Sequence, residues 1–333
     1  MKHRMPSSLT VIGVLGAVLL VLAAILSLAF GAVRFDVDVM FAALAGTATP
    51  EAVTIIRDLR APRVVLAALV GAALAMSGGA LQGTMRNPLA EPYLLGVSGG
   101  AAVGAVIVMA LGASAPLWIT GAAFLGAAIA TVLVTLLAHL SGARGDTRVL
   151  IMAGVIVGAF ANAVILVALA DAPPDRIRGA LWWMMGSAAD ATWGSVVRTA
   201  AALLVLGGAI LWRARNLDVL ALGTEPAAAL GVDVDRVARQ LFLIGSWLAA
   251  ATVAAAGLIG FVGLVVPNIA RALGARHHRG MLWVSALLGA LLLVLADLLA
   301  RTVRAPAELP LGAITALIGV PFFLTRLRRS TAS

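Results

Sequence analysis

The sequence predicts an all-α membrane protein of about ten transmembrane helices, some of them short or broken, in a single domain over residues 1–333. The mean hydropathy is +1.06. Charged residues make up only 12% of the chain, whereas soluble proteins carry about 25%. Several apolar runs reach the roughly 20 residues that a helix needs to cross a bilayer. Arginines lie between these runs, so the net charge of +9 indicates membrane topology rather than a nucleic-acid groove.

The first half of the chain predicts five spans. The first apolar run follows basic residues and is longer than the apolar core of about 7–15 residues in a secretory signal. We therefore expect a retained span with a cytoplasmic N-terminus. The composition turns polar over residues 34–60, which are expected to form an external loop on the periplasmic side. Gly96, Gly100 and Gly104 have the spacing that lets two helices pack closely. The expected spans cover residues 9–33, 62–82, 94–111, 118–140 and 149–170.

The second half adds five spans and two amphipathic segments. Residues 171–192 are rich in tryptophan and methionine, which suits the periplasmic membrane surface. Residues 217–239 are too polar to span, and short helices at the cytoplasmic surface are expected there rather than a plain connecting loop. The apolar run 241–269 has arginines on both flanks, so it should cross twice and turn near residues 254–257. The remaining expected spans are 193–212, 281–300 and 311–324, and they leave both termini in the cytoplasm.

Three motifs carry a resemblance to one transporter family. They are QGTMRNPLAEPYLLGVSGGAAVGA (82–105), GLIGFVGLVVPNIAR (257–271) and AELPLGAITALIGVPFF (307–323). These motifs closely resemble the FecCD-type (BtuC-like) permeases, the membrane subunits of ATP-binding-cassette (ABC) importers for iron-siderophores, haem and cobalamin. The resemblance runs over about residues 57–326. It implies the BtuC-like permease fold and import of a metal chelate, first an iron-siderophore, with cobalamin or haem as the alternatives.

The resemblance also implies partners. A second copy would complete a homodimer in the bacterial cytoplasmic (inner) membrane, with the pathway between the copies. Two cytoplasmic ATP-binding subunits and a periplasmic or lipid-anchored substrate-binding protein would complete the importer. The only lysine is Lys2, so a GxxxxGK[ST] phosphate loop is absent and ATP hydrolysis belongs to another chain. No cofactor is expected. The chain has no cysteine and no HExxH motif, so we predict neither a metal site nor a membrane enzyme.

A candidate ATPase-coupling segment lies at residues 217–232, where GTEPAAALGV is similar to the coupling loop of the family. Small side chains would let a short helix sit closely in a groove of the ATPase, and two leucines would anchor it. The candidate coupling residues are Leu217, Leu222, Gly223, Thr224, Glu225, Ala227, Ala228, Leu230, Gly231 and Val232.

Candidate gate and pathway residues cluster where spans are predicted to end inside. Pro88 lacks an amide hydrogen and disfavours helical geometry at Asn87, so a helix should end there. A similar break at residues 267–268 suggests an inverted repeat, whose paired interruptions point to a transport pathway. The alternative is hydrogen bonding between helices. The family often has histidine at the position of Asn268, which leaves the chemistry of that residue open. The set is Gln82, Asn87, Pro88, Leu89, Asp146, Thr147, Pro267 and Asn268.

Asp297 is the one carboxylate well inside an apolar run. Such an acid is a candidate for proton or cation coupling, and an ion-coupled secondary transporter is the alternative from another functional class. Arg301 lies four residues further on, where a local ion pair is the favoured interpretation.

Five arginines are predicted to face outward beside the expected spans. Only Asp58, Asp297 and Glu308 lie near them in the sequence, so an exposed positive surface is expected. The resemblance extends to the LRAPR and ADLLAR strings and implies that three of these arginines pair with acidic residues of the binding protein. Guanidinium groups suit bidentate capture of carboxylates. The alternative is that they anchor headgroups or pair locally. The candidate docking residues are Arg57, Arg60, Arg63, Arg301 and Arg304.

Overall fold

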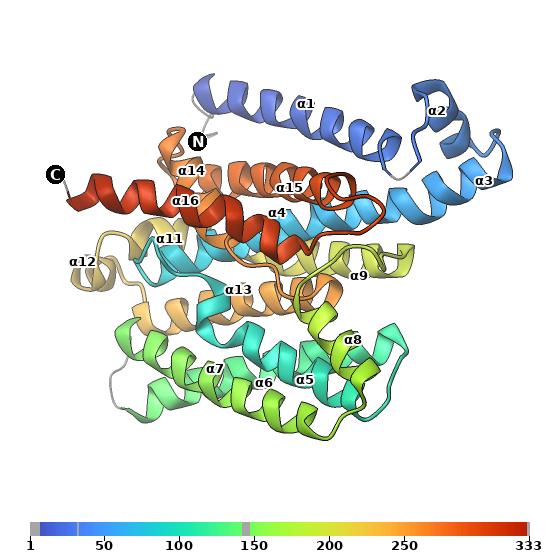
Figure 1. Cartoon of the computed structure of the whole chain (residues 1–333). Helices are drawn as coiled ribbons and strands as arrows, with labels where there is room; N and C mark the ends of the chain where they lie inside the picture. Colours follow the sequence, from blue (N-terminus) through green and yellow to red (C-terminus); the bar gives the residue numbers. More distant parts are fainter. Residues whose placement is uncertain (1–6, 32, 142–146, 332–333) are drawn as a thin grey trace.

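The fold is a bundle of long helices that lie roughly parallel to one another, and it is given by a computed structural model (Figure 1). The structure describes residues 7–31, 33–141 and 147–331, and these residues contain helices but no strand. The helices are α1 (Ser7–Ala29), α2 (Val37–Ala45), α3 (Pro50–Val53), η1 (Thr54–Arg60), α4 (Ala61–Thr84), η2 (Pro92–Leu95), α5 (Val97–Ala110), α6 (Pro116–Leu140), α7 (Thr147–Ala170), α8 (Pro174–Met184), α9 (Trp193–Ala202), η3 (Leu203–Gly207), α10 (Gly208–Trp212), α11 (Ala214–Leu220), α12 (Thr224–Ala229), α13 (Val234–Ala256), α14 (Val262–Ala272), α15 (His278–Thr302) and α16 (Leu311–Thr331).

Membrane-crossing helices dominate the described residues. By length and composition, 7 helices are apolar enough to cross a bilayer. Three shorter apolar helices, Val97–Ala110, Val262–Ala272 and Leu311–Phe322, lie beside them. Together they match the expected set of about ten spans with short members, and the all-α prediction is confirmed.

The loop expected over residues 34–60 is the main error in the predicted boundaries. The structure forms α2 there, and α3 and η1 run without interruption into α4. Thr49 starts this helix, since its hydroxyl accepts a hydrogen bond from the Ala52 amide at 3.4 Å. Ile56 is fully buried, whereas Arg57 and Asp58 are exposed. Glu51, Arg57 and Asp58 therefore lie on the outer face of an amphipathic helix instead of in a loop.

The break predicted within residues 241–269 is confirmed, although its position is shifted slightly. α13 ends at Ala256 and α14 begins at Val262. Gly257 and Phe261 both have positive φ, at 72° and 68°, so the chain cannot continue as one helix between them. At its other end α13 begins at Val234, where the Asp233 carboxylate accepts from the Arg236 amide at 3.0 Å.

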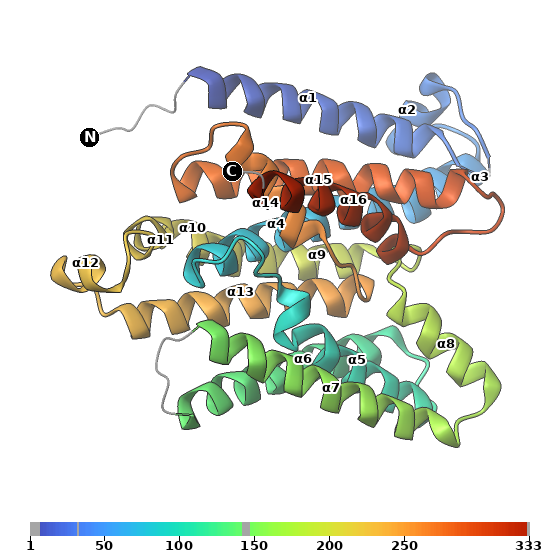
Figure 2. The ribbon, with the colours of Figure 1, turned by 60° about the vertical axis from the view of Figure 1, so that its left-hand side comes forward.

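The predicted surface segment 217–239 is correct in part. α11 and α12 are short helices, as expected, and the plain-loop alternative is wrong. Residues 234–239 instead belong to α13. α12 projects beyond the long helices at one end of the bundle, where α1 also begins and α16 ends (Figures 1 and 2). We refer to this as the α12 end, and to the opposite end, which carries α2 and α3, as the α2 end.

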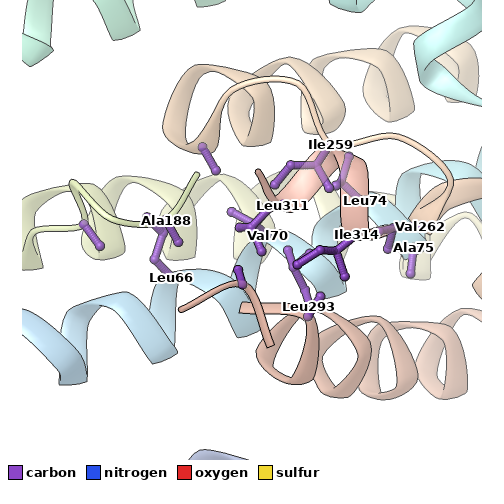
Figure 3. Close-up of a cluster of buried hydrophobic side chains, with 14 of the residues drawn as sticks. Leu66, Val70, Leu74, Ala75, Ala188, Ile259, Val262, Leu293, Leu311 and Ile314 are labelled. Atoms are coloured by element: carbon purple, nitrogen blue, oxygen red, sulfur yellow. The ribbon is translucent and has the colours of Figure 1, made fainter. Parts of the chain in front are cut away.

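The core is built around α4, which is buried along most of its length. Glycines allow two helix backbones to touch it. A Cβ atom at Gly71 would lie 2.1 Å from the Gly289 oxygen of α15, and one at Gly78 would lie 2.0 Å from the Gly263 oxygen of α14. Apolar side chains from α4, α14, α15 and α16 fill the space between these contacts (Figure 3). The glycine pattern of α5 serves the same purpose, since Cβ atoms at Gly100 and Gly104 would meet backbone of α6.

Candidate gate, coupling and docking sites

A polar cluster joins the last turn of α4 to α14, near the α12 end. Pro267 lies inside α14 and has no N–H to donate to the Gly263 carbonyl four residues earlier. The Gln82 amide supplies the missing donor, since its Nε2 lies 3.0 Å from the Gly263 oxygen and 3.2 Å from that of Leu264. Gln82 is 2% exposed. α14 therefore continues through Pro267, so the helix break predicted at residues 267–268 is wrong, and a side chain from another helix supplies the hydrogen bond that the proline cannot donate.

Asn268 and Arg271 extend this cluster to the link that follows α4. The Asn268 Nδ2 donates to the Pro88 oxygen at 3.0 Å and to the Leu264 oxygen at 2.8 Å. Arg271 Nη1 lies 2.8 Å from Gln82 Oε1 and 3.2 Å from Asn268 Oδ1. Three predicted gate residues, Gln82, Pro88 and Asn268, are thus linked, and Arg271, which was not among the predicted gate residues, bridges Gln82 and Asn268.

The link itself has a defined turn. The Asn87 side-chain oxygen accepts from the backbone N–H of Leu89 at 2.9 Å, and the backbone N–H of Asn87 donates to the backbone carbonyl of Gln82 at 3.1 Å. Leu89 is 46% exposed, so it faces away from the cluster. The other predicted gate element is described only in part. Asp146 lies outside the described residues, and Thr147 is the first residue of α7.

Glu91 fixes the end of the same link against the break between α13 and α14. Its carboxylate accepts from the Phe261 amide, and Phe261 is the residue that precedes α14. Glu91 is 7% exposed. This burial raises its pKa to about 7, although the hydrogen bond from Phe261 opposes the change. The sequence contains a signal for this site, since Glu91 is the one acidic residue of the motif at residues 82–105 and lies next to a proline.

The coupling segment divides into an anchored part and an exposed part. Leu217 and Ala227 are fully buried, so they hold the segment against the bundle rather than presenting it to a partner. Leu222 and Leu230 are 60% and 64% exposed and flank α12. Positive φ angles at Gly223 and Gly231, 110° and 79°, turn the chain sharply on either side of α12. The remaining predicted members, Thr224, Glu225 and Ala228, are exposed, and Val232 is half-buried.

Arg60 is buried, and it lies against the last turn of α1. Its guanidinium donates to the Leu28 oxygen at 2.7 Å, to the Ala29 oxygen at 3.2 Å and to the Val33 oxygen at 2.6 Å. Leu28 and Ala29 are the last two residues of α1, whose carbonyls lack partners within the helix and where the helix dipole favours a cation. Arg60 is 7% exposed. It therefore caps a helix instead of contributing to a free positive surface.

Arg63 and Arg301 are also buried, and they surround Asp297. Arg63 lies 2.9 Å from the Asp297 carboxylate and 2.7 Å from that of Glu308. Arg301 lies 3.5 Å from Asp297 and donates to Ser27 of α1. The predicted Asp297–Arg301 pair is present, but Arg63 is the closer partner.

The expectation of an exposed positive surface is thus wrong for three of the five arginines. Arg57 and Arg304 are exposed at the α2 end, as the expectation of an exposed positive surface requires. The other three lie where α1, α4 and α15 converge, a convergence that sequence spacing does not show. Among the described residues, no group of three His, Cys, Asp or Glu could hold a metal ion.

The model of the FecCD transport family matches residues 19–329. The chain belongs to this family. The FecCD chain is 45% identical over 281 residues to the cobalamin import system permease protein BtuC of Halobacterium salinarum, covering 84% of this chain and 75% of the relative. It is 40% identical over 322 residues to the hemin transport system permease protein HmuU of Yersinia pestis, covering 94% and 93%.

The fold agrees with this assignment. A solved structure of a metal-chelate type ABC transporter in an inward-facing conformation matches the FecCD chain with a TM-score of 0.87 at 29% identity. The match covers 96% of this chain and 99% of that one. The protein is a multi-pass membrane permease of the ABC importer class. The secondary-transporter alternative is wrong, and Asp297 is paired with Arg63 and Arg301 within the permease.

Proposed function

We propose that this FecCD permease carries a metal chelate into the cell as the membrane subunit of an ABC importer. The observation that carries the proposal is the near-complete structural match to a metal-chelate transporter, together with the family match over residues 19–329. The membrane would be the bacterial cytoplasmic (inner) membrane. The α12 end would face the cytoplasm with both termini, and the α2 end would face the periplasm.

The coupling segment is where we place the ATP-binding subunits, one for each copy of a homodimer. The exposed leucines on either side of α12 supply an apolar anchor, and the buried Leu217 and Ala227 transmit contact to the bundle. Leu222 and Leu230 would enter a groove on the ATPase surface. Two copies of the permease would then require two ATPase subunits, with the pathway between the copies.

The gate is placed at the link between α4 and η2 and at the start of α7. Leu89 is exposed at the tip of the Asn87 turn, and the turn is held from behind by Asn268. Together with Asp146 and Thr147, the residues Asn87, Pro88 and Leu89 would form the cytoplasmic gate. Non-helical backbone at this depth suits a lined cavity.

Docking of a periplasmic or lipid-anchored binding protein is placed at the α2 end. Arg57 and Arg304 supply exposed positive charge there. An acidic rim on the binding protein would be steered toward these two residues. The buried Arg60, Arg63 and Arg301 would hold the underlying helices in register.

The substrate class is a metal chelate, with iron-siderophore first and cobalamin or haem as the alternatives. The relatives named for cobalamin and hemin are similarly close to the FecCD chain. Reconstitution with its ATPase and binding protein in proteoliposomes tests the proposal. ATP-dependent uptake of one member of a panel of ferric siderophores, haem and cobalamin is expected. Uptake that follows an ion gradient without ATP would refute it.

A further inference from the structure

One carboxylate oxygen joins the coupling segment to the start of α15. Asp218, in α11, accepts the backbone N–H of His278 at 2.9 Å through Oδ1. The ring Nδ1 of the same histidine lies 2.7 Å from that oxygen, so it carries the proton. His278 is the first residue of α15, where backbone amides lack partners within the helix. An acid from another helix therefore caps α15, in the position that the helix dipole favours.

The His278 ring also lies against the last turn of α4. A Cβ atom at Gly83 would be 2.8 Å from His278 Nε2 and 3.1 Å from Leu217 Cδ2. Leu217 is fully buried beside Asp218. The coupling segment, the start of α15 and the end of α4 thus meet at one point.

From this point, contacts lead directly to the gate cluster. Gln82 precedes Gly83 in the chain and binds Arg271, which in turn contacts Asn268. In the other direction, α4 and α15 are held together by the backbone contact between Gly71 and Gly289. A displacement of α11 would therefore move α4 and α15 as a pair, because packed backbones at this distance do not slide freely.

We propose that Asp218 and His278 are a positioning pair that transmits movement of the ATPase to the gate. The proposal rests on the proposed function, in which the coupling segment binds the ATPase. The pair contacts neither ATP nor chelate. Its role is to keep α11 attached to the α4–α15 unit, so that a displacement of α12 reaches the Asn87 turn.

The test uses the reconstituted importer and a cysteine introduced at position 87 by Asn87→Cys in this cysteine-free chain. Asp218→Asn weakens the acceptor, and His278→Leu removes the ring donor from the opposite side. His278→Asn restores an amide donor near the position of Nδ1. Arg215→Gln, an exposed position on α11, is the matched control. ATPase-subunit binding, ATP hydrolysis, chelate uptake and nucleotide-dependent thiol labelling are measured for each.

We expect Asp218→Asn and His278→Leu to bind the ATPase normally but to lose about tenfold in chelate taken up per ATP hydrolysed. Labelling at position 87 should stop responding to nucleotide. His278→Asn should recover most of both signals, and Arg215→Gln should change neither. The double variant Asp218→Asn/His278→Leu should be no worse than either single variant, because the two residues form one interaction.

Two results would overturn the pair as a link while leaving the proposed function intact. The first is normal uptake per ATP in both variants. The second is a lower yield of inserted protein whose labelling still responds to nucleotide, which would make the pair structural only. Failure of the unchanged chain to bind ATPase or to show ATP-dependent uptake would overturn both proposals.

Discussion

The backbones of Gly71 and Gly289 are in direct contact, although the two residues are far apart in the sequence. Small residues at such a crossing let two helices approach closely. A Cβ atom at Gly71 would lie 2.1 Å from the Gly289 oxygen and 2.9 Å from the Leu293 Cβ. Neither neighbour can move without a shift of α15. We therefore predict that Gly71→Ala destabilises the protein by about 1–3 kcal/mol, measured as a lower melting temperature in detergent.

Gly121 offers the control for this prediction. It also lies in a long helix, α6, but nothing lies within 4 Å of a Cβ atom placed there. Gly121→Ala should leave the melting temperature unchanged or raise it, because alanine favours helix over glycine. Equal effects of the two substitutions would mean that helix propensity, rather than backbone contact, decides the result.

Asp297 provides a second prediction, because it is a buried acid with two cationic neighbours. Its side chain is 0% exposed and that of Arg63 is 10% exposed. Asp297→Asn removes the negative charge that balances the positive charges of Arg63 and Arg301. Removing one partner of a buried ion pair typically lowers the folding stability by about 3–5 kcal/mol. We expect a lower melting temperature but ATP-dependent uptake by the protein that remains folded. Uptake that becomes independent of a proton gradient only in this variant would instead restore a coupling role for Asp297.

Much of this architecture could be predicted from composition and motif, and the misses share one cause. Apolar runs located the ten spans, and the arginines around residues 241–269 predicted the break that Gly257 and Phe261 make. The buried arginines were misjudged because their partners are distant in sequence. Arg60 binds carbonyls of α1, and Arg63 binds Asp297 of α15. Sequence counting compares charges with nearby acids and cannot identify a backbone carbonyl as the partner.

The gate cluster shows the same limit at a smaller scale. Asn87 and Pro88 were enough to predict the helix interruption after α4, whereas the break predicted at residues 267–268 is wrong, because α14 continues through Pro267 to Ala272. The pattern did not predict that Arg271 would join Gln82 to Asn268. That connection depends on the crossing of α4 and α14 at Gly78 and Gly263, which a linear motif does not specify.

The exposed face of α12 leads to a third prediction. Ala228→Trp adds bulk where the coupling segment is proposed to enter the ATPase, and Gly231→Val forces a branched residue into a φ of 79°. Both should insert into the membrane normally and reduce uptake per ATP by about tenfold. Ala115→Trp, at an exposed position before α6 at the opposite end, is the control. Normal transport by both α12 variants would remove this segment from the ATPase interface.

Docking at the α2 end gives a fourth prediction, which separates exposed from buried arginines. Arg57→Glu with Arg304→Glu should slow association of the binding protein and flatten its salt dependence, because rim charges act mainly on the on-rate. The melting temperature should not change. Arg215→Glu reverses an exposed charge at the α12 end and should leave association unaffected. By contrast, Arg60→Glu should lower the melting temperature, since it removes the donor to α1. Unchanged association in the double variant would exclude these two residues from docking.

Glu91 supplies the last prediction, a pH dependence of stability. Burial raises its pKa from the ordinary 4.5 to about 7, so the folded protein retains a proton that the unfolded chain releases. The sign follows from linkage, because the state that binds more protons is favoured at low pH. Between pH 4.5 and 7 the folded protein should therefore lose stability as the pH rises, by about 1.4 kcal/mol per pH unit. Below and above that window, Glu91 contributes no further slope.

Glu91→Gln isolates this contribution. Its amide oxygen can still accept from the Phe261 amide, but the side chain cannot ionise. Melting temperatures in detergent at pH 5 and pH 8 should therefore differ less in Glu91→Gln than in the unchanged protein. Glu51→Gln, at an exposed carboxylate in α3, should retain the full difference. If the unchanged protein and Glu91→Gln respond equally to pH, the Glu91 carboxyl ionises in the folded state as it does in the unfolded chain, and burial does not raise its pKa.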